Sequence, residues 1–532
     1  MSLLDDASIV ITPNGVKVST LYAVIPVPTE GAEEVTNGDF ATDGTPSTNT
    51  WTLGWYSNTA NVSISGGKIT LTNSASESSS LAYATNGVSS NNVLTTNQLY
   101  KLQYQVIANN GVTSFKYYSS AGSFIDAPID LGVTHTIYIK NTSNQLFLFQ
   151  NATTNSNISL DNVSVKEYTS ADMDFTRATT ATRIDENGNI VEVGDGVPRI
   201  DYTGGGCPHI LAEPMRTNLV TYSEDFSNAL WGKQVGGIGS TPIVTSDYAT
   251  SPDGTLNADR IQLSLNGGTS SADQSYINYS ITSGTESTGS IYVKTADGSS
   301  KTIYLRTSTA GGLATKTITS DWTRIEQTES VGDFFVFGLR GGFGTSDSTD
   351  LLVWGGQYER GSYATSYIPT SGGTVTRNQD IFTRDGIGSL INSTEGCVFG
   401  EGNFAESSIS GYMYFASLSD GTLSNRLEVR QDTNNLKFLW RVGTYQSSIT
   451  TSGIDVGVNF KFAVNYSSAN IKFYVNGNPI GTINTPTLWT ADTLNRLGLD
   501  DGGGGYPFYG KVKQLQVYDT SLSDTQLAAL TS

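Results

Sequence analysis

The chain has 532 residues with a formal net charge of −19; 15% of its residues are charged and 10% are aromatic. A single hydrophobic core stops growing near about 250–300 residues, so a chain of this length contains several domains. The acidic balance, without any cluster of Lys and Arg, excludes the usual basis of nucleic-acid binding, and no stretch approaches the roughly 20 apolar residues of a membrane-spanning helix.

The composition also favours folded β structure. Gly, Ser, Thr and Asn dominate the polar residues, and windows rich in Ala, Leu, Glu and Lys, which favour long helices, are nearly absent. The aromatic content and low charge are not those of a disordered chain. We therefore expect an all-β protein.

Residues 1–34 contain two apolar runs, SIVITP and LYAVIPV, but lack the basic start and unbroken apolar core of a signal peptide. We therefore expect assembly in a cytoplasm. The segment is too short to fold alone, which predicts an arm that docks on another protein. A frayed terminus is the alternative.

Residues 35–168 form the first predicted domain, with strand-like runs throughout. The run NVSISGGKITLT alternates and turns at Gly66-Gly67, as a hairpin does. The closing run NISLDNVSVKEY predicts an inward row on both sides of a local irregularity, made by Ile158, Leu160, Val163 and Val165.

Residues 169–219 form a predicted connector, because short hairpin-like pieces alternate with Asn-Gly, Asp-Gly and Gly-Gly-Gly turns. Such a segment is expected to fold only by packing on a neighbouring domain or chain.

Residues 220–377 form a second predicted domain that repeats the theme of the first. The phrase VTYSEDF at 220–226 repeats VTNGDF at 35–40, and a tryptophan follows each phrase, at Trp231 and at Trp51. The two domains are therefore expected to share one architecture, with Trp231 and, near the end of the second, Trp354 in the core.

Residues 378–532 form a third predicted β domain. Asn476-Gly477 in FYVNGNPI is a strong hairpin signal. The run LSDTQLAAL predicts the one helix, with Ser523 or Asp524 as its cap.

Several motifs resemble known families. The opening VTNGDF and the closing SLDNVSVKEY of residues 35–168 resemble carbohydrate-binding jelly rolls appended to glycoside hydrolases. Residues 216–377, above all QYERGSYATSYIPT, resemble a module of bacteriophage tail and fibre proteins. Residues 378–532, through FYVNGNPIG and YGKVKQLQVYDTSLSDTQLAAL, resemble concanavalin A-like or laminin G-like sandwiches.

These resemblances imply a fold of tandem jelly rolls followed by a concanavalin A-like sandwich. The N-terminal segment and the connector are also similar to phage fibre or virion-attached proteins. The implied function is a trimeric fibre subunit on the virion surface that binds host-cell or mucus glycans, with residues 1–34 docked on other virion proteins. A purely structural head or tail decoration that binds other virion proteins is the main alternative.

Candidate glycan-binding residues follow from the chemistry of sugars, whose apolar C–H faces stack on aromatic rings while polar side chains bind the hydroxyl groups. Two clusters combine such residues: Trp51, Trp55 and Tyr56 in the first domain, and Trp440, Arg441 and Tyr445, with Trp489 further on, in the third. A core position is the alternative for each tryptophan.

Structural calcium is the one cofactor that we expect. In jelly-roll binding modules, oxygen ligands often hold Ca²⁺ between the first and last strands, and Asp39 and Asp161 occupy those positions. Asp225 matches Asp39, but the second domain has no acidic partner in its closing run. Asp500 and Asp501 precede a glycine run, where a loop site or a solvated turn is possible.

The sequence does not predict an enzyme. The chain has two histidines, His135 and His209, and two cysteines, Cys207 and Cys397, which we expect to be free thiols. Glycoside hydrolysis needs paired carboxylates, and the spacing E-x-D-x-x-E of concanavalin-like hydrolases is missing. A polysaccharide-degrading enzyme stays an alternative, because carboxylates distant in sequence can meet in the fold.

Overall fold

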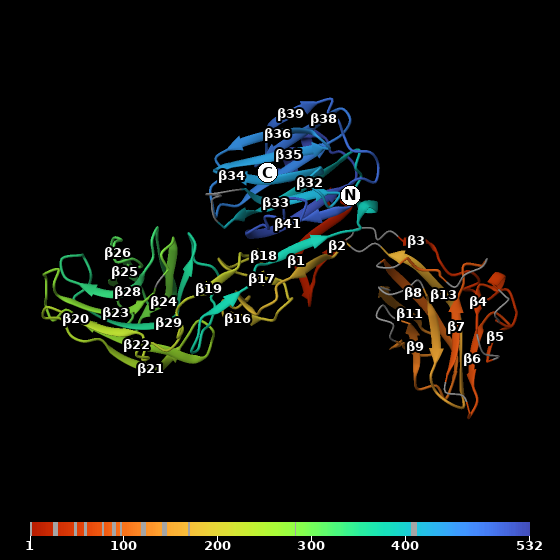
Figure 1. Ribbon diagram of the computed structural model, residues 1–532, viewed down its shortest axis with the longest axis horizontal. Helices are drawn as coiled ribbons and strands as arrows, with labels where there is room; N and C mark the ends of the chain where they lie inside the picture. Colours follow the sequence, from red (N-terminus) through yellow and green to blue (C-terminus); the bar gives the residue numbers. More distant parts are fainter. Residues whose placement is uncertain are drawn as a thin grey trace. The chain divides into compact units, whose positions relative to one another are not determined.

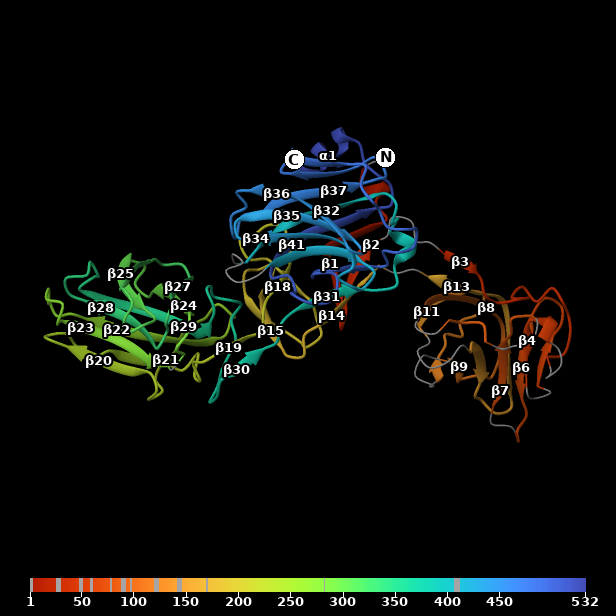
Figure 2. The same cartoon turned by 45° about the horizontal axis from the view of Figure 1, so that its top comes forward.

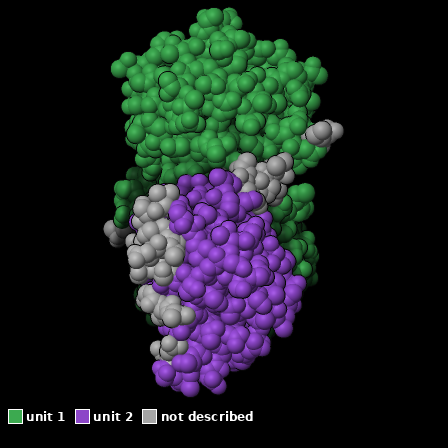
Figure 3. All heavy atoms as spheres, turned by 90° about the vertical axis from the view of Figure 1, so that its right-hand side faces the viewer, with its two compact units in different colours: residues 1–26, 171–532 green, residues 27–170 purple. Residues whose placement is uncertain are grey.

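The computed structural model describes residues 3–24, 30–46, 51–57, 61–76, 79–87, 92–95, 98–118, 124–140, 146–168, 171–281, 283–405 and 412–532. The predicted all-β fold is confirmed: nearly every element in these residues is a strand (Figure 1). The chain forms two compact units. One comprises Val27–Ser170, and the other combines Met1–Pro26 with Ala171–Ser532 (Figure 3).

The first unit is a sandwich of two antiparallel sheets, here called the first sandwich. One sheet has the order β10-β9-β12-β7-β4, and the other has the order β11-β8-β13-β6-β5 with β3 also on β13. The elements are β3 (Glu30–Glu33), η2 (Trp51–Leu53), β4 (Trp55–Tyr56), β5 (Val62–Ile64), β6 (Ile69–Asn73), β7 (Ser80–Ala84), β8 (Leu99–Asn110), β9 (Phe115–Tyr118), β10 (Phe124–Asp126), β11 (Thr134–Lys140), β12 (Leu148–Asn151) and β13 (Ser156–Tyr168).

The closing strand β13 confirms the predicted inward row around an irregularity. Ile158, Leu160, Val163 and Val165 are all buried in the core. The pairing of β13 with β8 shifts register after Asp161, and Asn162 has a left-handed φ of 51°. This bulge moves the inward side chains from even to odd positions.

The second sandwich (residues 220–377) also has two antiparallel sheets, in the orders β20-β23-β28-β25-β26 and β21-β22-β29-β24-β27 (Figures 1 and 2). Its strands are β20 (Gly232–Gly236), β21 (Ile243–Thr250), β22 (Leu256–Ser264), β23 (Gln274–Ser280), β24 (Ser287–Thr295), β25 (Lys301–Arg306), β26 (Ala314–Ile318), β27 (Thr323–Glu329), β28 (Phe334–Arg340), β29 (Ser348–Arg360) and β30 (Val375–Arg377). Trp231 and Trp354 are buried, as predicted. Trp231 lies in the sandwich core, whereas Trp354 packs with Ile190 of the connector.

The C-terminal domain is built on a 16-stranded sheet that also contains strands from the N-terminal segment and the connector. The order is β36-β35-β34-β33-β40-β31-β14-β2-β1-β41-β32-β37-β38-β39, with β17 and β18 attached through β41. Its strands after the connector are β31 (Ile381–Arg384), β32 (Gly396–Phe404), β33 (Met413–Ser419), β34 (Asn425–Asp432), β35 (Asn435–Val442), β36 (Tyr445–Ser452), β37 (Phe460–Tyr466), β38 (Asn470–Val475), β39 (Asn478–Asn484), β40 (Arg496–Gly498) and β41 (Gly510–Tyr518), with the short helix η3 (Gly388–Leu390).

Two local predictions for this domain are confirmed. Asn476 and Gly477, with φ of 47° and 79°, form the tight turn between β38 and β39. The helix α1 (Asp524–Thr531), the one α-helix among the described residues, begins after Ser523, whose side chain accepts a hydrogen bond from the Gln526 N–H in a capping box.

The N-terminal segment differs from the expected arm. Besides the short helix η1 (Leu3–Asp6), it forms β1 (Ile9–Lys17) and β2 (Thr20–Val24). Strand β1 pairs with β2 on one side and with β41 on the other. Ile9, Ile11 and Leu21 are buried in the core of the C-terminal domain. The apolar runs do require burial, and residues 9–24 satisfy that need within the same chain and not as a free docking arm.

The connector also folds by packing on its neighbours. Its strands are β14 (Met173–Thr176), β15 (Ala181–Ile184), β16 (Ile190–Val193), β17 (Arg199–Asp201), β18 (His209–Ala212) and β19 (Arg216–Asn218). Strand β14 lies between β2 and β31, β18 pairs with β41, and β19 pairs with β30 of the second sandwich. The connector therefore joins the second sandwich to the C-terminal domain.

Five buried charged residues form a network where these parts meet: Arg177, Arg199, Glu213, Arg377 and Asp380. Asp380 accepts hydrogen bonds from Arg177 (3.0 Å) and from Arg199. Glu213 accepts from Arg199 (2.6 Å) and lies 2.8 Å from Arg377. Burial lowers the pKa of Arg199, but Asp380 and Glu213 outweigh burial, and the pKa lies above its ordinary value. The opposite charges of the network, together with nearby carbonyl and hydroxyl groups, stabilise each buried charge.

One buried carboxylate of the second sandwich predicts a pH-dependent stability. The pKa of Asp259 is raised to about 6, mainly because the side chain is buried. Nearby carboxylates of Asp225 and Asp247 also raise the pKa, whereas hydrogen bonds from the N–H groups of Asp247 and Phe226 lower it. The folded pKa is above the unfolded value, so the folded chain holds the extra proton, and stability falls as pH rises from about 4 to 6. We expect a loss on the order of 3 kcal/mol across this range.

Pulse proteolysis in urea, read on fragments of the second sandwich, measures this effect. Asp259→Asn is expected to flatten the pH dependence, whereas Asp297→Asn, at an exposed turn, is expected to leave it unchanged. An unaltered slope in Asp259→Asn contradicts the assignment.

Candidate functional site

Three of the tryptophans predicted to bind glycans are core residues, which corrects that prediction. Trp55 and Trp440 are fully buried, and Trp489 is nearly so. Their indole N–H groups donate to backbone carbonyls: Trp55 to Asn37 (3.2 Å), Trp440 to Thr487 (3.0 Å) and Trp489 to Arg441 (2.8 Å). A sugar ring has no access to these faces.

Trp55 is the structural counterpart of Trp231. Its ring lies 5.6 Å from that of Phe40, and the ring of Trp231 lies 4.7 Å from that of Phe226. The repeated opening phrase therefore places its phenylalanine against a buried tryptophan in both sandwiches, and in the first copy this is Trp55. The side chain of Trp51 lies outside the described residues.

The remaining predicted residues are more accessible. Tyr56 is half-buried beside Tyr83, with ring centroids 5.4 Å apart. Tyr445 is 47% exposed, its ring lies 5.0 Å from that of Trp440, and Arg441 is half-buried. Tyr445 is therefore accessible to a ligand, but the two tryptophans expected to share its binding face are buried.

The predicted calcium residues lie on segments that do meet. The Val163 N–H donates to the Gly38 carbonyl (2.8 Å), which brings the opening segment against the bulge in β13. Asp39 accepts from the Ala41 N–H (3.3 Å), and Asp161 accepts from the Asn162 N–H (2.6 Å). Across the described residues no three His, Cys, Asp or Glu side chains gather as ligands for a metal. Calcium at Asp39 and Asp161 stays a prediction.

A different part of the C-terminal domain combines two exposed aromatic rings with a buried arginine. We call it the Tyr–Arg surface; it comprises Tyr412, Tyr414, Arg430 and Tyr506, with Glu428 beneath. Tyr506 is 62% exposed and Tyr412 is 43% exposed. The ring of buried Tyr414 lies 6.4 Å from that of Tyr412 and 6.0 Å from that of Tyr506. The Arg430 guanidinium lies 3.7 Å from the centre of the Tyr412 ring.

Buried polar groups hold this surface in place. Tyr414 and Arg430 are opposite each other on β33 and β34, and Arg430 donates to the Tyr414 hydroxyl (3.1 Å). Arg430 also donates to Glu428 (2.7 Å), whose second oxygen accepts from Arg426. Because both arginines are anchored on one buried carboxylate, the aromatic platform is preorganised.

The loop that carries Tyr506 is fixed by two aspartates. Asp501 accepts from the N–H groups of Gly503 and Gly505, both at 2.9 Å. Asp500 accepts from the Gly502 N–H (2.7 Å) and from Arg496 (2.8 Å). Asp500 and Asp501 are both buried, so they are acceptors that hold the glycine-rich loop in place and not the solvated turn considered from the sequence.

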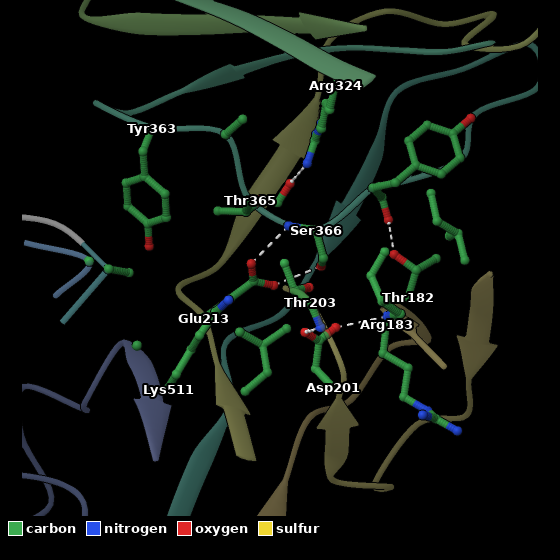
Figure 4. A pocket seen from close by; sticks show the side chains of 18 of the residues that line it. Thr182, Arg183, Asp201, Thr203, Glu213, Arg324, Tyr363, Thr365, Ser366 and Lys511 are labelled. Atoms are coloured by element: carbon green, nitrogen blue, oxygen red, sulfur yellow. Dashed lines mark hydrogen bonds between the residues drawn. The ribbon is translucent and has the colours of Figure 1, made fainter. Parts of the chain in front are cut away.

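A pocket of about 440 Å³ lies among the connector, the second sandwich and the C-terminal domain, as Figure 4 shows from close by. The connector contributes Asp201, Thr203 and Glu213, the second sandwich contributes Tyr292, Arg324 and Tyr363–Tyr367, and the C-terminal domain contributes Asn403, Phe404 and Lys511. All of these parts belong to one compact unit. The pocket has a volume typical of small-ligand sites.

Both carboxylates that line this pocket are already satisfied. Burial raises the pKa of Asp201, but hydrogen bonds from His209 and from the N–H groups of Ile184 and Thr203 outweigh burial and lower the pKa to about 2. Burial likewise raises the pKa of Glu213, but Arg377 and Arg199 hold it well below its usual range. Both side chains are therefore anions at neutral pH, and neither is poised as a general acid.

Each of the two histidines contacts an oxygen atom of an aspartate, one in a side chain and one in the backbone. His209 Nε2 is 3.1 Å from Asp201, and His135 contacts the Asp130 carbonyl (3.0 Å). Both cysteines are free thiols, as predicted; Cys207 is exposed and Cys397 is buried. In the part of the chain that the structure describes, no helix is long and apolar enough to cross a membrane.

Comparisons with known proteins give matches to solved structures and to one family model. No curated protein sequence matches the chain. Similar solved structures include the CBM40 of the IT-sialidase from Ruminococcus gnavus bound to α2,3-sialyllactose, at 18% identity over 26% of this chain and 83% of that chain, with a TM-score of 0.24. Domain 4 of AbnA, a GH43 arabinanase from Geobacillus stearothermophilus, in complex with arabinotriose, is 12% identical over 32% of this chain and 84% of that chain, with a TM-score of 0.26.

A family model also matches part of the chain. Residues 405–528 match the concanavalin A-like lectin/glucanases superfamily in its laminin G form. This range contains the Tyr–Arg surface and most strands of the 16-stranded sheet. The chain therefore ends in a concanavalin A-like, laminin G-like domain.

Proposed function

We propose that this protein is a non-enzymatic attachment subunit that binds glycans through the Tyr–Arg surface. The observation that carries the proposal is the pair of exposed rings, Tyr412 and Tyr506, on either side of buried Tyr414 with Arg430 stacked on Tyr412. A sugar stacks its C–H face on such rings, while the guanidinium donates to its hydroxyl or carboxylate oxygens. The match of this domain to a superfamily of lectins and glucanases supports the same function.

Substitution of the most exposed tyrosine tests the site. On a glycan array, Tyr506→Ala is expected to weaken binding of the best glycan at least about tenfold, or about 1.4 kcal/mol, because one stacking face is lost. Tyr445→Ala, which removes another exposed tyrosine elsewhere on the same domain, serves as the matched control and is expected to bind normally.

If Tyr506→Ala and Tyr445→Ala weaken glycan binding equally, the binding site includes the surface around Tyr445 that the sequence predicted. Normal binding by Tyr506→Ala with lost binding by Tyr445→Ala would exclude the Tyr–Arg surface outright.

We further propose that the subunit belongs to a bacteriophage fibre exposed on the virion. The resemblance of residues 216–377 to tail and fibre modules supports this proposal, and the same resemblance favours a homotrimer. Three copies of a weak site on one fibre convert millimolar contacts into avidity. Since residues 9–24 are occupied in the C-terminal domain, attachment to the particle is assigned to other surfaces of the chain.

The purely structural decoration is the second candidate, because sandwiches in series also serve as spacers. It predicts no glycan binding by the intact chain. A polysaccharide-degrading activity is the third candidate and predicts shortening of host polysaccharide. Glu428, the carboxylate beneath the platform, accepts hydrogen bonds from Arg426 and Arg430, which suits a fixed anchor, although burial raises its pKa above the ordinary value.

A further inference from the structure

We propose that the pocket in Figure 4 is a second ligand site, which takes a carboxylated sugar of one or two rings. It is separate from the Tyr–Arg surface and shares no residue with it. The inference comes from three features of the pocket, which are its unneutralised cations, its aromatic walls and its fixed polar groups.

The charge balance of the pocket selects an anion. Of its two carboxylates, Glu213 is paired with Arg199 and Arg377, whereas Asp201 keeps its charge and accepts hydrogen bonds from backbone N–H groups. Two cationic side chains of the lining, Arg324 and Lys511, have no carboxylate within ion-pair distance among the described residues. A site with surplus positive charge in a protein of net charge −19 favours a negatively charged ligand.

Arg324 is preorganised rather than free. It donates to the Thr365 carbonyl (2.6 Å) and the Ser290 hydroxyl (2.9 Å), and its guanidinium lies 5.3 Å from the centre of the Tyr292 ring. Its Nε is buried and has no hydrogen-bond partner among the described residues. Because these acceptors are uncharged, they do not cancel the positive charge of Arg324, which therefore attracts an anionic ligand. Lys511 provides a movable ammonium, and Figure 4 shows it on the same side as Tyr363 and Glu213.

The aromatic walls of the pocket favour a sugar ring over a small inorganic anion. Tyr292, Tyr363, Tyr367 and Phe404 line the pocket, and most of its accessible wall is apolar. Such walls stack on the C–H faces of a pyranose, whereas a small inorganic anion leaves them solvated. Thr203 and Asn403 add a hydroxyl and an amide that are suited to sugar hydroxyl groups.

Binding of D-glucuronate to the full chain, measured by isothermal titration calorimetry with D-glucose as the neutral isostere, tests the proposal. Glucuronate is expected to bind at least about tenfold more tightly than glucose, because one charge-assisted contact is worth about that factor. Lys511→Gln is expected to weaken glucuronate binding by a similar factor.

Lys513→Gln is the matched control, since Lys513 lies on the same strand but 3.7 Å from Glu401 and outside the pocket; it is expected to bind glucuronate normally. Thr203→Val is a second test of the site, chosen because Thr203 is exposed and its replacement leaves the buried core unchanged. This variant is expected to weaken binding of both sugars. Tyr506→Ala is expected to retain glucuronate binding, so failure of the Tyr–Arg surface and failure of this pocket are told apart.

Three results overturn the proposal. They are the absence of glucuronate binding to the unaltered chain, equal affinity for glucuronate and glucose, and equal losses in Lys511→Gln and Lys513→Gln. Displacement of glucuronate by inorganic phosphate at equal concentration shows a site for a bare anion, which overturns the assignment to a sugar.

Discussion

Ile9→Ala is expected to destabilise the C-terminal domain by about 2–5 kcal/mol, although it lies some 500 residues before β41 in the sequence. Ile9 is fully buried and pairs with Val517 across the β1–β41 interface. Removal of its side chain leaves a cavity in a core that the N-terminal segment shares. Pulse proteolysis in urea, scored on C-terminal fragments, gives the change in unfolding free energy.

Val18→Ala is the control for this substitution, because Val18 belongs to the same segment but is 68% exposed. It is expected to change the unfolding free energy by less than about 0.5 kcal/mol. If Ile9→Ala also changes the unfolding free energy by less than that value, the N-terminal segment contributes little to the C-terminal domain. A detachable arm that docks on a virion protein is then the better interpretation.

Asp380→Ala is expected to cost about 3–5 kcal/mol, because it leaves the buried guanidinium groups of Arg177 and Arg199 without their shared carboxylate. The loss is expected in the parts that the network joins, namely the connector and the adjoining C-terminal domain. In hydrogen exchange, Asp380→Ala is expected to speed amide exchange more in β14 and β17 than in β34.

Asp385→Ala provides the comparison on the surface. The side chain of Asp385 lies 3.2 Å from Arg496 but is largely exposed, and exposed pairs contribute less than about 1 kcal/mol. Similar costs for the two substitutions contradict the view that the buried network holds the connector in place.

Local sequence signals predicted much of the fold. The Asn476-Gly477 turn, the Ser523 cap and the bulge between Leu160 and Val163 each depend on a few neighbouring residues. Backbone sterics and hydrogen bonding within such a short stretch decide the outcome there. The repeated opening phrase likewise predicted two related sandwiches.

Long-range packing decided what the sequence could not predict. Val10 pairs with Gln516, and nothing in either run indicates that the two ends of the chain form adjacent strands. Trp440 and Trp489 follow strand patterns that fit either a core or a binding face, and only the opposing sheet determines which face is covered. Tyr506 lies in a glycine-rich loop, where no periodicity distinguishes a binding residue from a solvated one.

The Tyr–Arg surface lies in one of the two domains in which the sequence predicted glycan-binding residues, but it consists of other residues. Arg441 and Tyr445 are accessible, yet the tryptophans expected beside them are in the core. The pairing of Tyr414 with Arg430 on adjacent strands depends on register, which a single sequence does not reveal. An Arg-x-Glu-x-Arg run on one strand face, at Arg426–Arg430, was the signal available.

Hydrogen exchange of the full chain, with and without the glycan that binds best on the array, tests the central claim most directly. Glycan binding at the Tyr–Arg surface predicts protection in residues 412–418 and 500–508. Protection confined to residues 51–57 of the first sandwich, or no protection anywhere in the C-terminal domain, would contradict it.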